Sequence, residues 1–506
     1  MLSKVYCASC RGLEVTTVTV EVEVSDGICF HLVGLADNAI KESQQRIGSA
    51  LGKFGFRIPG KKIIINLAPA NLRKEGSAFD AAIAIGILTA SGQIETQWYE
   101  DFLIMGELAL DGSLRPIDGA LPIAIHAAEK GFKGCILPKE SAAECSEVDG
   151  TTIFFAQTLE DIINIISSPE TASSHIPLRR EYIPKNEWEF DFADVKGQAF
   201  AKKGLEIAAA GGHNAILVGS PGCGKTFMAK CIPSILPPME KQEAIETSKV
   251  YSIAGLLKSA GGLIRERPFR SPHHTSTVQA LAGSLGMPGE VSLAHNGVLF
   301  ADEIAEFGRA SLEILRQPLE DREIQVCRAK TRVCYPASFM LIAAMNPCPC
   351  GYLNDPKKSC RCSSSAIMKY AGKLSGPLMD RIDIQLNVKS VPPEEIVGLG
   401  KGDEEPSSEI AKRVKMAREI QLERFKGENF YTNAQIPAGK LAKYCRIGER
   451  ERIFLKNFIA RQGISARGYS RILKISRTIA DLDGKDFISL EHISKAVQLK
   501  LNINDF

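Results

Sequence analysis

Residues 215–226 read AILVGSPGCGKT, and this stretch decides the class of fold. The apolar run 215–218 is typical of a buried strand, and 227–231 can begin a helix. Between them lies the pattern G-x-x-x-x-G-K-[ST], formed by Gly219, Ser220, Pro221, Gly222, Cys223, Gly224, Lys225 and Thr226. A strand, a glycine-rich loop and a helix in this order are the context in which the pattern binds phosphates, so a chance glycine loop is the weaker alternative.

The residue types in this loop suit phosphate chemistry. Glycines let backbone N–H groups approach phosphate oxygens, and the helix N-terminus adds the positive end of a dipole. Lys225 is predicted to reach the β- and γ-phosphates, and Thr226 to hold Mg²⁺. The sequence therefore predicts a site for ATP or GTP with Mg²⁺.

Two further apolar runs end in polar residues. Residues 298–303 read VLFADE, so a strand would deliver Asp302 to the metal and place Glu303 where it can activate water. Residues 339–345 form another strand, which ends at Asn346, an amide that can orient a water. The alternative for both is an ordinary strand-end turn, at Asn346 one that precedes Pro347.

The chain has 506 residues, too many for one compact core, and we expect an α/β multidomain protein. Residues 1–167 are predicted to form a mixed α/β domain, with strands at 13–24, 63–67 and 102–105 and helices at 37–54, 77–90 and 121–130. A linker rich in proline and serine, 168–188, precedes an ATPase core at 189–392. Residues 393–506 are expected to hold a second linker and a lid with helices at 408–426, 440–460 and 468–480.

The formal net charge of +3 hides an uneven distribution of charge. Residues 1–170 carry 14 basic and 22 acidic side chains, whereas 401–506 carry 21 basic and 14 acidic ones. The start of the chain lacks the apolar segment of a signal peptide, and the longest apolar run, near 81–90, is far shorter than the roughly 18 residues of a membrane span. We therefore expect a cytoplasmic protein without a membrane partner, in which disulfides are disfavoured.

Four of the 14 cysteines lie in one predicted insertion, 346–364: Cys348, Cys350, Cys360 and Cys362. Four thiolates can complete a tetrahedral shell around Zn²⁺, and the glycine, asparagine and proline between the two pairs suit a tight loop. The C-x-C spacing is tighter than usual, and free thiols or a redox pair are the alternatives. We expect a structural zinc site.

Five segments resemble the magnesium-chelatase-like group of AAA+ ATPases, and more closely the ComM/YifB competence-protein family. They are RSPHHT (270–275), EVSLAHNGVLFADE (290–303), AAMNPCPCGY (343–352), SGPLMDRIDI (375–384) and SARGYSRILKISRTIADL (465–482). The similarity extends through the N-terminal domain and so covers nearly the whole chain.

The resemblance implies roles for residues beyond the phosphate loop. Asn346 would be sensor 1, and Arg381 the arginine finger offered to the γ-phosphate of a neighbouring subunit. Arg467 would be the sensor-2 arginine that contacts nucleotide from the lid, with Arg471, one turn on, as the alternative. A surface ion pair is the ordinary fate of such arginines. A finger that acts between subunits implies a ring, and the family implies a hexamer.

The N-terminal segments 72–80 and 102–138 are similar to the proteolytic domain of the Lon protease family. The similarity puts Ala78 at the position of the nucleophilic serine, with Ser77 one residue early, and Leu121 at the position of the catalytic lysine. A serine–lysine mechanism needs a basic amine beside the hydroxyl. We therefore expect a Lon-like fold without a protease substrate.

By resemblance, ATP hydrolysis drives a ring that remodels DNA, by branch migration or helicase activity in homologous recombination or natural transformation. Single-stranded or branched DNA is the predicted partner. A basic stretch at 440–480 agrees with this, as do four basic residues on a predicted hairpin at 323–335: Arg322, Arg328, Lys330 and Arg332. The alternatives are a magnesium-chelatase-type motor subunit, a protein-remodelling ATPase and a scaffold. His273 and His274 would face the ring pore by resemblance, or solvent otherwise.

Overall fold

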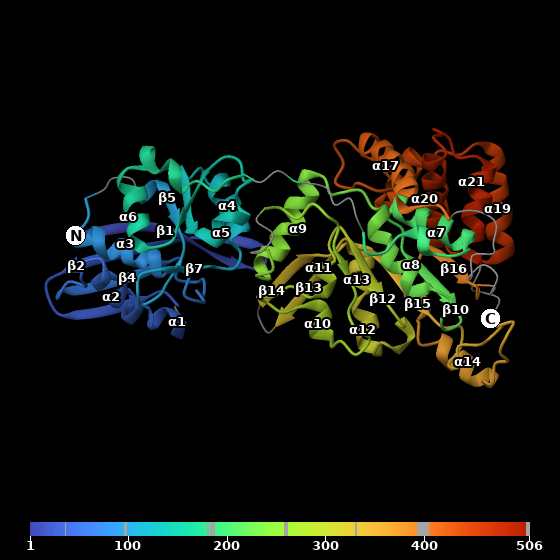
Figure 1. The fold of residues 1–506 in the computed structure, drawn as a ribbon, viewed down its shortest axis with the longest axis horizontal. Helices are drawn as coiled ribbons and strands as arrows, with labels where there is room; N and C mark the ends of the chain where they lie inside the picture. Colours follow the sequence, from blue (N-terminus) through green and yellow to red (C-terminus); the bar gives the residue numbers. More distant parts are fainter. Residues whose placement is uncertain are drawn as a thin grey trace.

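The computed structural model describes residues 1–35, 37–95, 99–179, 182, 188–257, 262–328, 331–391 and 404–501. Its elements follow one another along the longest axis of the molecule (Figure 1). An N-terminal α/β domain lies at one end, a second sheet lies in the middle, and a group of C-terminal helices lies at the other end. The architecture is mixed α/β with more than one sheet, as the sequence predicts.

The N-terminal sheet has seven strands in the order β3-β4-β2-β1-β5-β8-β9. On β2, Val18, Val20 and Val22 are buried and alternate with more exposed residues, which confirms the strand expected there. The strands are β1 (Leu2–Arg11), β2 (Glu14–Ser25), β3 (Cys29–Val33), β4 (Lys62–Ala68), β5 (Phe102–Ile104), β8 (Gly134–Pro138) and β9 (Thr152–Ala156). A separate small hairpin joins β6 (Glu107–Leu108) to β7 (Leu114–Arg115).

Helix α3 (Asp80–Ala90) runs through the interior of this domain, where all its residues are buried. It packs on β1 and β2, so its apolar sequence on every side is that of a core helix. No helix in the described ranges is both long and apolar enough to cross a bilayer. The other helices here are α1 (Asn38–Lys41), α2 (Ser43–Lys53), α4 (Ala120–Glu129), α5 (Lys139–Glu144) and α6 (Leu159–Ser167).

The second sheet has five parallel strands in the order β11-β12-β15-β10-β16. They are β10 (Ala215–Gly219), β11 (Phe269–Arg270), β12 (Val298–Ala301), β15 (Met340–Met345) and β16 (Ile384–Val388). The ends at which these strands finish meet at one edge of the sheet, here called the carboxyl edge, and their starts meet at the opposite amino edge. Because β15 lies between β10 and β12, the residue after β15 lies between the residues that follow the other two strands.

The C-terminal helices do not form a core of their own. They share one hydrophobic cluster with β10, β16 and α7 (Ala199–Gly211), and α17 (Ser407–Arg424) packs directly on α7. The prediction of one helix over 440–460 is wrong, because the chain leaves the helical conformation at 445–448 and Gly448 starts a new helix. The helices are α17 (Ser407–Arg424), α18 (Leu441–Tyr444), α19 (Glu449–Gln462), α20 (Ala466–Leu482) and α21 (Leu490–Leu501).

Residues of the predicted ATPase core complete the core of the N-terminal domain. Ala244 on α9 (Lys241–Ile253) and the following Leu257 belong to the same hydrophobic cluster as the seven-stranded sheet. Across this junction, the backbone N–H of Leu121 donates to Ser252 Oγ (3.2 Å). The predicted domain boundaries stay predictions, because the hydrophobic core of the N-terminal domain contains residues from both sides of the first predicted linker, 168–188.

The two predicted linkers lie partly outside the described residues. Within the first, the 3₁₀ helix η2 (Pro169–His175) packs on α6 and β9, so this part lies against the N-terminal domain. Of the second linker, residues 393–403 are not described. The remaining short helices of the middle segment are α8 (Lys225–Cys231), α10 (Val278–Ala282), α11 (Glu290–Leu293), α12 (Arg309–Ile314), α13 (Arg316–Asp321), α14 (Ser364–Ala371) and α15 (Gly376–Met379).

The predicted hairpin forms from β13 (Glu323–Arg328) and β14 (Thr331–Pro336). Arg328 and Arg332 are exposed on it, and Lys330 lies outside the described residues. The prediction that Arg322 belongs to this basic surface is wrong. Arg322 ends α13 in the left-handed conformation (φ 63°), which turns its guanidinium inward toward the carbonyl of Phe339 (3.4 Å), and burial lowers its pKa.

Candidate nucleotide site and metal centre

The glycine-rich loop joins the end of β10 to the first turn of α8. Gly224 precedes that helix with a φ of 93°, a backbone angle that residues other than glycine rarely adopt. Lys225 is only 9% exposed, and its ammonium donates to the carbonyls of Gly219 (2.6 Å) and Ser220 (3.0 Å). Burial lowers the pKa of Lys225. The lysine is thus held within the loop that the sequence pattern assigns to phosphates.

Three strand ends bring the other predicted residues of this edge together. Thr226 Oγ1 donates to Asp302 Oδ2 (2.9 Å), so the hydroxyl and the carboxylate lie side by side after β10 and β12. Asn346, after β15, accepts a hydrogen bond from the Lys225 ammonium through Oδ1 (3.1 Å). Oxygen ligands of this kind suit Mg²⁺, which prefers a carboxylate and a hydroxyl together with phosphate oxygens.

The side chain of Glu303 stands apart from this hydrogen-bonded group, although its backbone N–H donates to Asp302 Oδ1 (3.0 Å). Its backbone is left-handed (φ 50°), and its side chain is 57% exposed. The imidazole of His274 lies beside it, with Nδ1 3.8 Å from Oε2, and the His274 ring packs against that of His273 (4.1 Å between ring centroids). A carboxylate that follows a metal ligand and faces solvent can accept a proton from an attacking water.

Arg381 and Arg467 lie at the opposite edge of the sheet from Lys225. Arg381 precedes β16, and the side-chain amide of Asn214, just before β10, donates to its carbonyl (3.0 Å). The five residues of β10 separate this edge from the phosphate loop by roughly 16 Å. The arginines meet at one carboxylate: Glu320 pairs with Arg381 and, at 2.9 Å, with Arg467.

The two candidate sensor-2 arginines on α20 have different surroundings. Arg471 is 16% exposed and pairs with Asp383 (2.8 Å), a carboxylate that also accepts from the backbone N–H of Asn214. Burial opposes ionisation of Asp383, but Arg471 and His213 outweigh it and keep the pKa of Asp383 below its ordinary value. Arg467 is 60% exposed. Arg471 is therefore engaged in the interior, whereas Arg467 is accessible.

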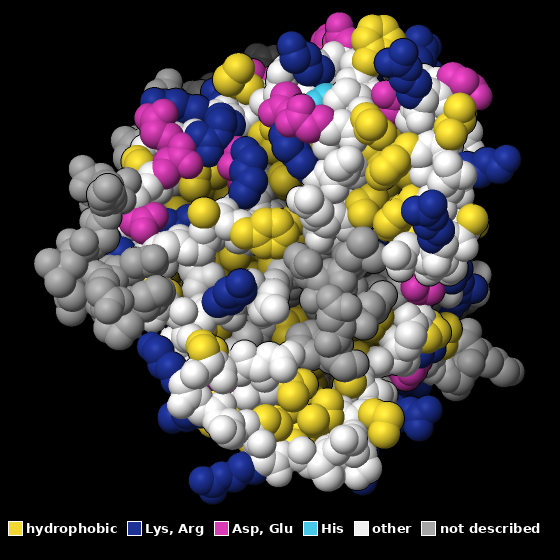
Figure 2. Space-filling model, turned by 90° about the vertical axis from the view of Figure 1, so that its right-hand side faces the viewer, with side chains coloured by type: hydrophobic (Ala, Val, Ile, Leu, Met, Phe, Trp, Pro, Cys, Tyr) yellow, Lys and Arg dark blue, Asp and Glu magenta, His cyan; other side chains and the backbone are white. Residues whose placement is uncertain are grey.

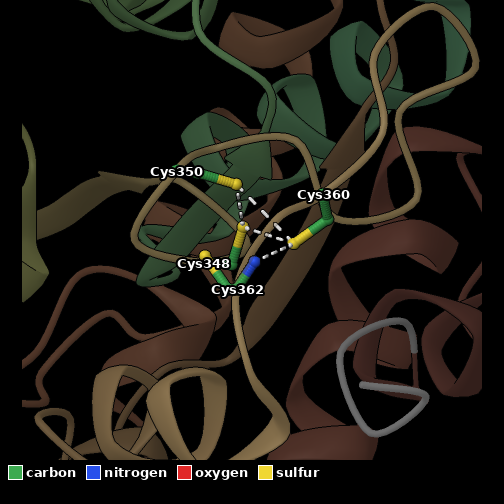
Figure 3. A group of neighbouring side chains, drawn as sticks. All are labelled: Cys348, Cys350, Cys360 and Cys362. Atoms are coloured by element: carbon green, nitrogen blue, oxygen red, sulfur yellow. Dashed lines mark hydrogen bonds between the residues drawn. The ribbon is translucent and has the colours of Figure 1, made fainter.

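The four predicted metal ligands come together after Asn346 (Figure 3). The Sγ atoms of Cys348, Cys350 and Cys360 are 3.4–3.7 Å apart, and that of Cys362 lies within 4.8 Å of all three. A tetrahedral zinc with Zn–S bonds of about 2.3 Å needs sulfurs about 3.8 Å apart, so the set fits this ion. The backbone N–H groups of Tyr352 and Arg361 lower the pKa of Cys350 to about 6. The backbone N–H of Cys362 lowers the pKa of Cys360, but burial and the neighbouring thiols outweigh it and raise that pKa to about 12, so Cys350 is the thiol that most readily forms the thiolate that metals bind.

Some contacts of the site could not be found from the sequence motifs. Glu320 belongs to no motif, yet it joins the two arginines. Asp383 is adjacent to the predicted finger, and only the fold shows that it is the partner of Arg471. His274 was expected at the ring pore or in solvent, and its place beside Glu303 follows from the pairing of β11 with β12.

Family models match most of the chain. The model for magnesium chelatase, subunit ChlI, matches residues 191–396, and that for its C-terminal part matches 404–500. A model for subunit ChlI of Mg-chelatase also matches residues 20–141. Together with the parallel sheet and its phosphate loop, these matches define the protein as an AAA+-type ATPase of the magnesium-chelatase-like group.

Whole-length relatives narrow this class. The chain is 41% identical over 505 residues to competence protein ComM of Haemophilus influenzae, covering 98% of this chain and 97% of that protein. It is 37% identical over 502 residues to protein YifB of Escherichia coli, with coverage of 99% and 97%. The chain therefore belongs to the ComM/YifB family of magnesium-chelatase-like ATPases. A shorter similarity, 26% over 145 residues, links 29% of the chain to 22% of the archaeal Lon protease of Methanocaldococcus jannaschii.

Proposed function

We propose that this protein is a ring-forming ATPase that uses ATP hydrolysis to remodel DNA, by branch migration or helicase activity in recombination or natural transformation. The observation that carries the ring is the separation of the two half-sites. Lys225, Thr226 and Asp302 occupy the carboxyl edge, and Arg381 lies roughly 16 Å away at the amino edge. An arginine so placed reaches a γ-phosphate only on another subunit, and a closed ring, here a hexamer, satisfies every site.

At the carboxyl edge, the residues of one subunit bind and activate the nucleotide. The loop 219–226 cradles the phosphates, with Lys225 on the β- and γ-phosphate oxygens. Thr226 and Asp302 hold Mg²⁺, which when bound neutralises phosphate charge. Asn346 orients the attacking water, and Glu303 accepts its proton as the water oxygen bonds to the γ-phosphorus and ADP leaves.

At the amino edge, Arg381 is the finger and Arg467 the sensor-2 arginine, both acting on a neighbour's nucleotide. A cavity of about 400 Å³ at this edge is lined by five basic and two acidic side chains: Arg322, Arg381, Arg467, Arg471, Lys474, Glu320 and Asp383. Such an excess of positive charge attracts phosphate. The ion pair of Arg471 with Asp383 favours Arg467 as the residue free to move toward nucleotide.

DNA as the substrate rests on the relative named for competence and on the exposed hairpin arginines, Arg328 and Arg332. The C-terminal end of the molecule gives less support for DNA binding than its net charge suggests. Figure 2 shows that Lys and Arg are interspersed with Asp and Glu over the upper part of this end. A magnesium-chelatase motor subunit is the second candidate, supported by the family models.

We assign no proteolytic activity to the N-terminal domain. The ammonium of Lys74 is bonded to backbone carbonyls, and the hydroxyl of Ser77 is bonded to Glu107, so the two side chains do not form a serine–lysine pair.

The cysteine cluster holds structural zinc in this proposal. Its donor set is four thiols within 4.8 Å of one another, and Cys348 is fully buried. Metal analysis of the purified protein is expected to find about one zinc per chain. A protein that carries no zinc after purification without chelators would contradict the assignment.

The decisive experiment measures steady-state ATP hydrolysis with no DNA, with single-stranded DNA and with a four-way junction, together with movement of the junction. We expect DNA to stimulate hydrolysis, and Lys225→Ala to abolish both activities. The double substitution Arg328→Ala with Arg332→Ala should lower the affinity for DNA and make that affinity less dependent on salt concentration. The exposed pair Lys53→Ala with Arg57→Ala is the matched control. If DNA does not change the rate of ATP hydrolysis and the junction does not move, the DNA role is contradicted and the ATPase assignment stays intact.

A further inference from the structure

The loop that carries the four cysteines touches the phosphate loop directly. Gly351 lies so close to Pro221 that a Cβ at this glycine would sit 2.6 Å from Pro221 Cδ. Farther along, Asp355 accepts hydrogen bonds from the backbone N–H groups of Lys357 (2.8 Å) and Lys358 (3.0 Å), and its interaction with the side chain of Ser220 lowers the pKa of Asp355. The cysteine loop therefore contacts two consecutive residues of the phosphate-binding pattern from outside.

The same loop is attached to the nucleotide site through its backbone. Asn346, which accepts a hydrogen bond from the Lys225 ammonium, is two residues before the first cysteine, Cys348. Cys348 is fully buried, and the three other cysteines are partly exposed. A change in the position of Cys348 thus acts on a residue that bonds the phosphate-binding lysine.

The shape of this loop depends on its cysteines. Residues 346–363 form neither helix nor strand, so few backbone hydrogen bonds fix their course. Thiol hydrogen bonds such as Cys350 to Cys360 (3.6 Å) are weak compared with metal–thiolate bonds. Binding of one ion by four thiolates would fix both ends of the loop and the segment between them, including Gly351 and Asp355.

We infer that the four-cysteine loop is an outer wall of the phosphate loop, and that metal binding by its thiolates keeps the affinity for ATP high. The inference rests on the proposed ATP site and assigns Asp355 and Gly351 as positioning residues for it. Loss of the metal releases the contacts on Pro221 and Ser220. Without these contacts, the phosphate loop becomes ordered only when nucleotide binds. The free-energy cost of this ordering lowers the affinity for ATP.

The test compares three forms of the full-length chain: Cys360→Ser with Cys362→Ser, Asp355→Asn, and the control Cys327→Ser with Cys334→Ser, whose cysteines are exposed on the hairpin. For each form, bound zinc, the thermal transition, and the Kd of a slowly hydrolysed ATP analogue are measured. The first variant is expected to lose zinc and to bind the analogue at least about tenfold more weakly. Asp355→Asn should keep its zinc and bind about threefold to tenfold more weakly. The control should match the wild type.

The outcomes separate the inference from the function on which it rests. A wild type that does not bind the analogue contradicts the proposed ATP site. A wild type that binds it equally well with zinc and after zinc removal overturns the inference and spares the ATP site. If the cysteine variant does not fold, Asp355→Asn decides, and an unchanged Kd in that variant overturns the inference as well.

Discussion

The two edges of the central sheet differ in how completely their residues bind one another. At the carboxyl edge, Lys225 is bonded to Asn346, and Thr226 to Asp302, so the side chains from three strand ends form one ordered group. At the amino edge, Arg381 and Arg467 share the carboxylate of Glu320, which is 44% exposed, and Arg381, itself 12% exposed, also donates to the carbonyl of Pro377 (2.7 Å). In the proposed function, the carboxyl edge binds nucleotide, and the amino edge supplies arginines to the nucleotide of a neighbouring subunit. The contrast supports assembly of complete sites between subunits.

The largest expected effect comes from Arg381→Ala, which removes the proposed finger from the amino edge. Turnover should fall by about 10³–10⁵-fold, because an arginine finger stabilises transition-state charge to this extent. The Kd for ATP should stay unchanged, since the binding residues lie at the other edge. Steady-state hydrolysis and equilibrium nucleotide binding measure the two quantities, and undiminished hydrolysis would remove Arg381 from the mechanism.

A mixture of two inactive variants sharpens the same contrast. Lys225→Ala subunits keep an intact amino edge, and Arg381→Ala subunits keep an intact carboxyl edge. Mixed rings contain some interfaces with both intact edges, so hydrolysis should reappear when the variants are combined. If the mixture stays inactive although the subunits assemble together, the two edges do not act on one another.

The next effect concerns stability and separates the two arginines of α20. Arg471→Ala leaves the buried carboxylate of Asp383 without its main partner and should lower the free energy of unfolding by about 3–5 kcal/mol. Arg467→Ala removes an exposed pair and should change it by less than about 1 kcal/mol. Denaturant titrations of both variants measure this difference, and equal losses would contradict the assignment of Arg471 as the interior residue.

The pair of Asp383 and Arg471 also sets a pH dependence. Since the pKa of Asp383 is lowered in the folded protein, its contribution to stability is present above the unfolded-state pKa of about 3.9. That contribution should be lost as the pH falls below this value toward the folded-state pKa. Asp383→Asn should remove this part of the acid dependence, measured as the free energy of unfolding between about pH 3 and 6.

The carboxyl edge was predictable from the sequence because its residues follow apolar runs. Lys225, Asp302 and Asn346 each come directly after a strand or its loop, and parallel strands necessarily bring such ends together. The four cysteines were predictable for a similar reason, since they are close in sequence. No local pattern links Arg381 to Arg467, because their shared contact with Glu320 depends on how α20 packs on α7, α17 and α21.

One wrong prediction and one contact that the sequence does not predict have equally physical origins. Arg322 precedes the alternating pattern of the hairpin by one residue, and its left-handed backbone turns the side chain inward where the pattern suggested solvent. The role of Ala244 in the N-terminal core was not predictable from the sequence. The residues that bury Ala244 belong to the N-terminal domain, on the other side of the predicted linker, and helix α9 has no strong apolar face of its own. Periodicity reports which side of an element is apolar, but not which other element covers it.

The smallest expected effect comes from Glu320→Gln, which tests whether the shared carboxylate competes with the neighbour's phosphate. Each arginine must exchange Glu320 for a phosphate oxygen before it can act in trans. Exposed ion pairs contribute about 0–1 kcal/mol, so stability should change by less than that, and hydrolysis should rise by at most about fivefold. Glu313→Gln is the matched control, because Glu313 pairs with Arg316 on the surface and touches neither arginine of the site. A tenfold fall in hydrolysis with Glu320→Gln would show that Glu320 orients the arginines instead, and the amino edge would then be as ordered as the carboxyl edge.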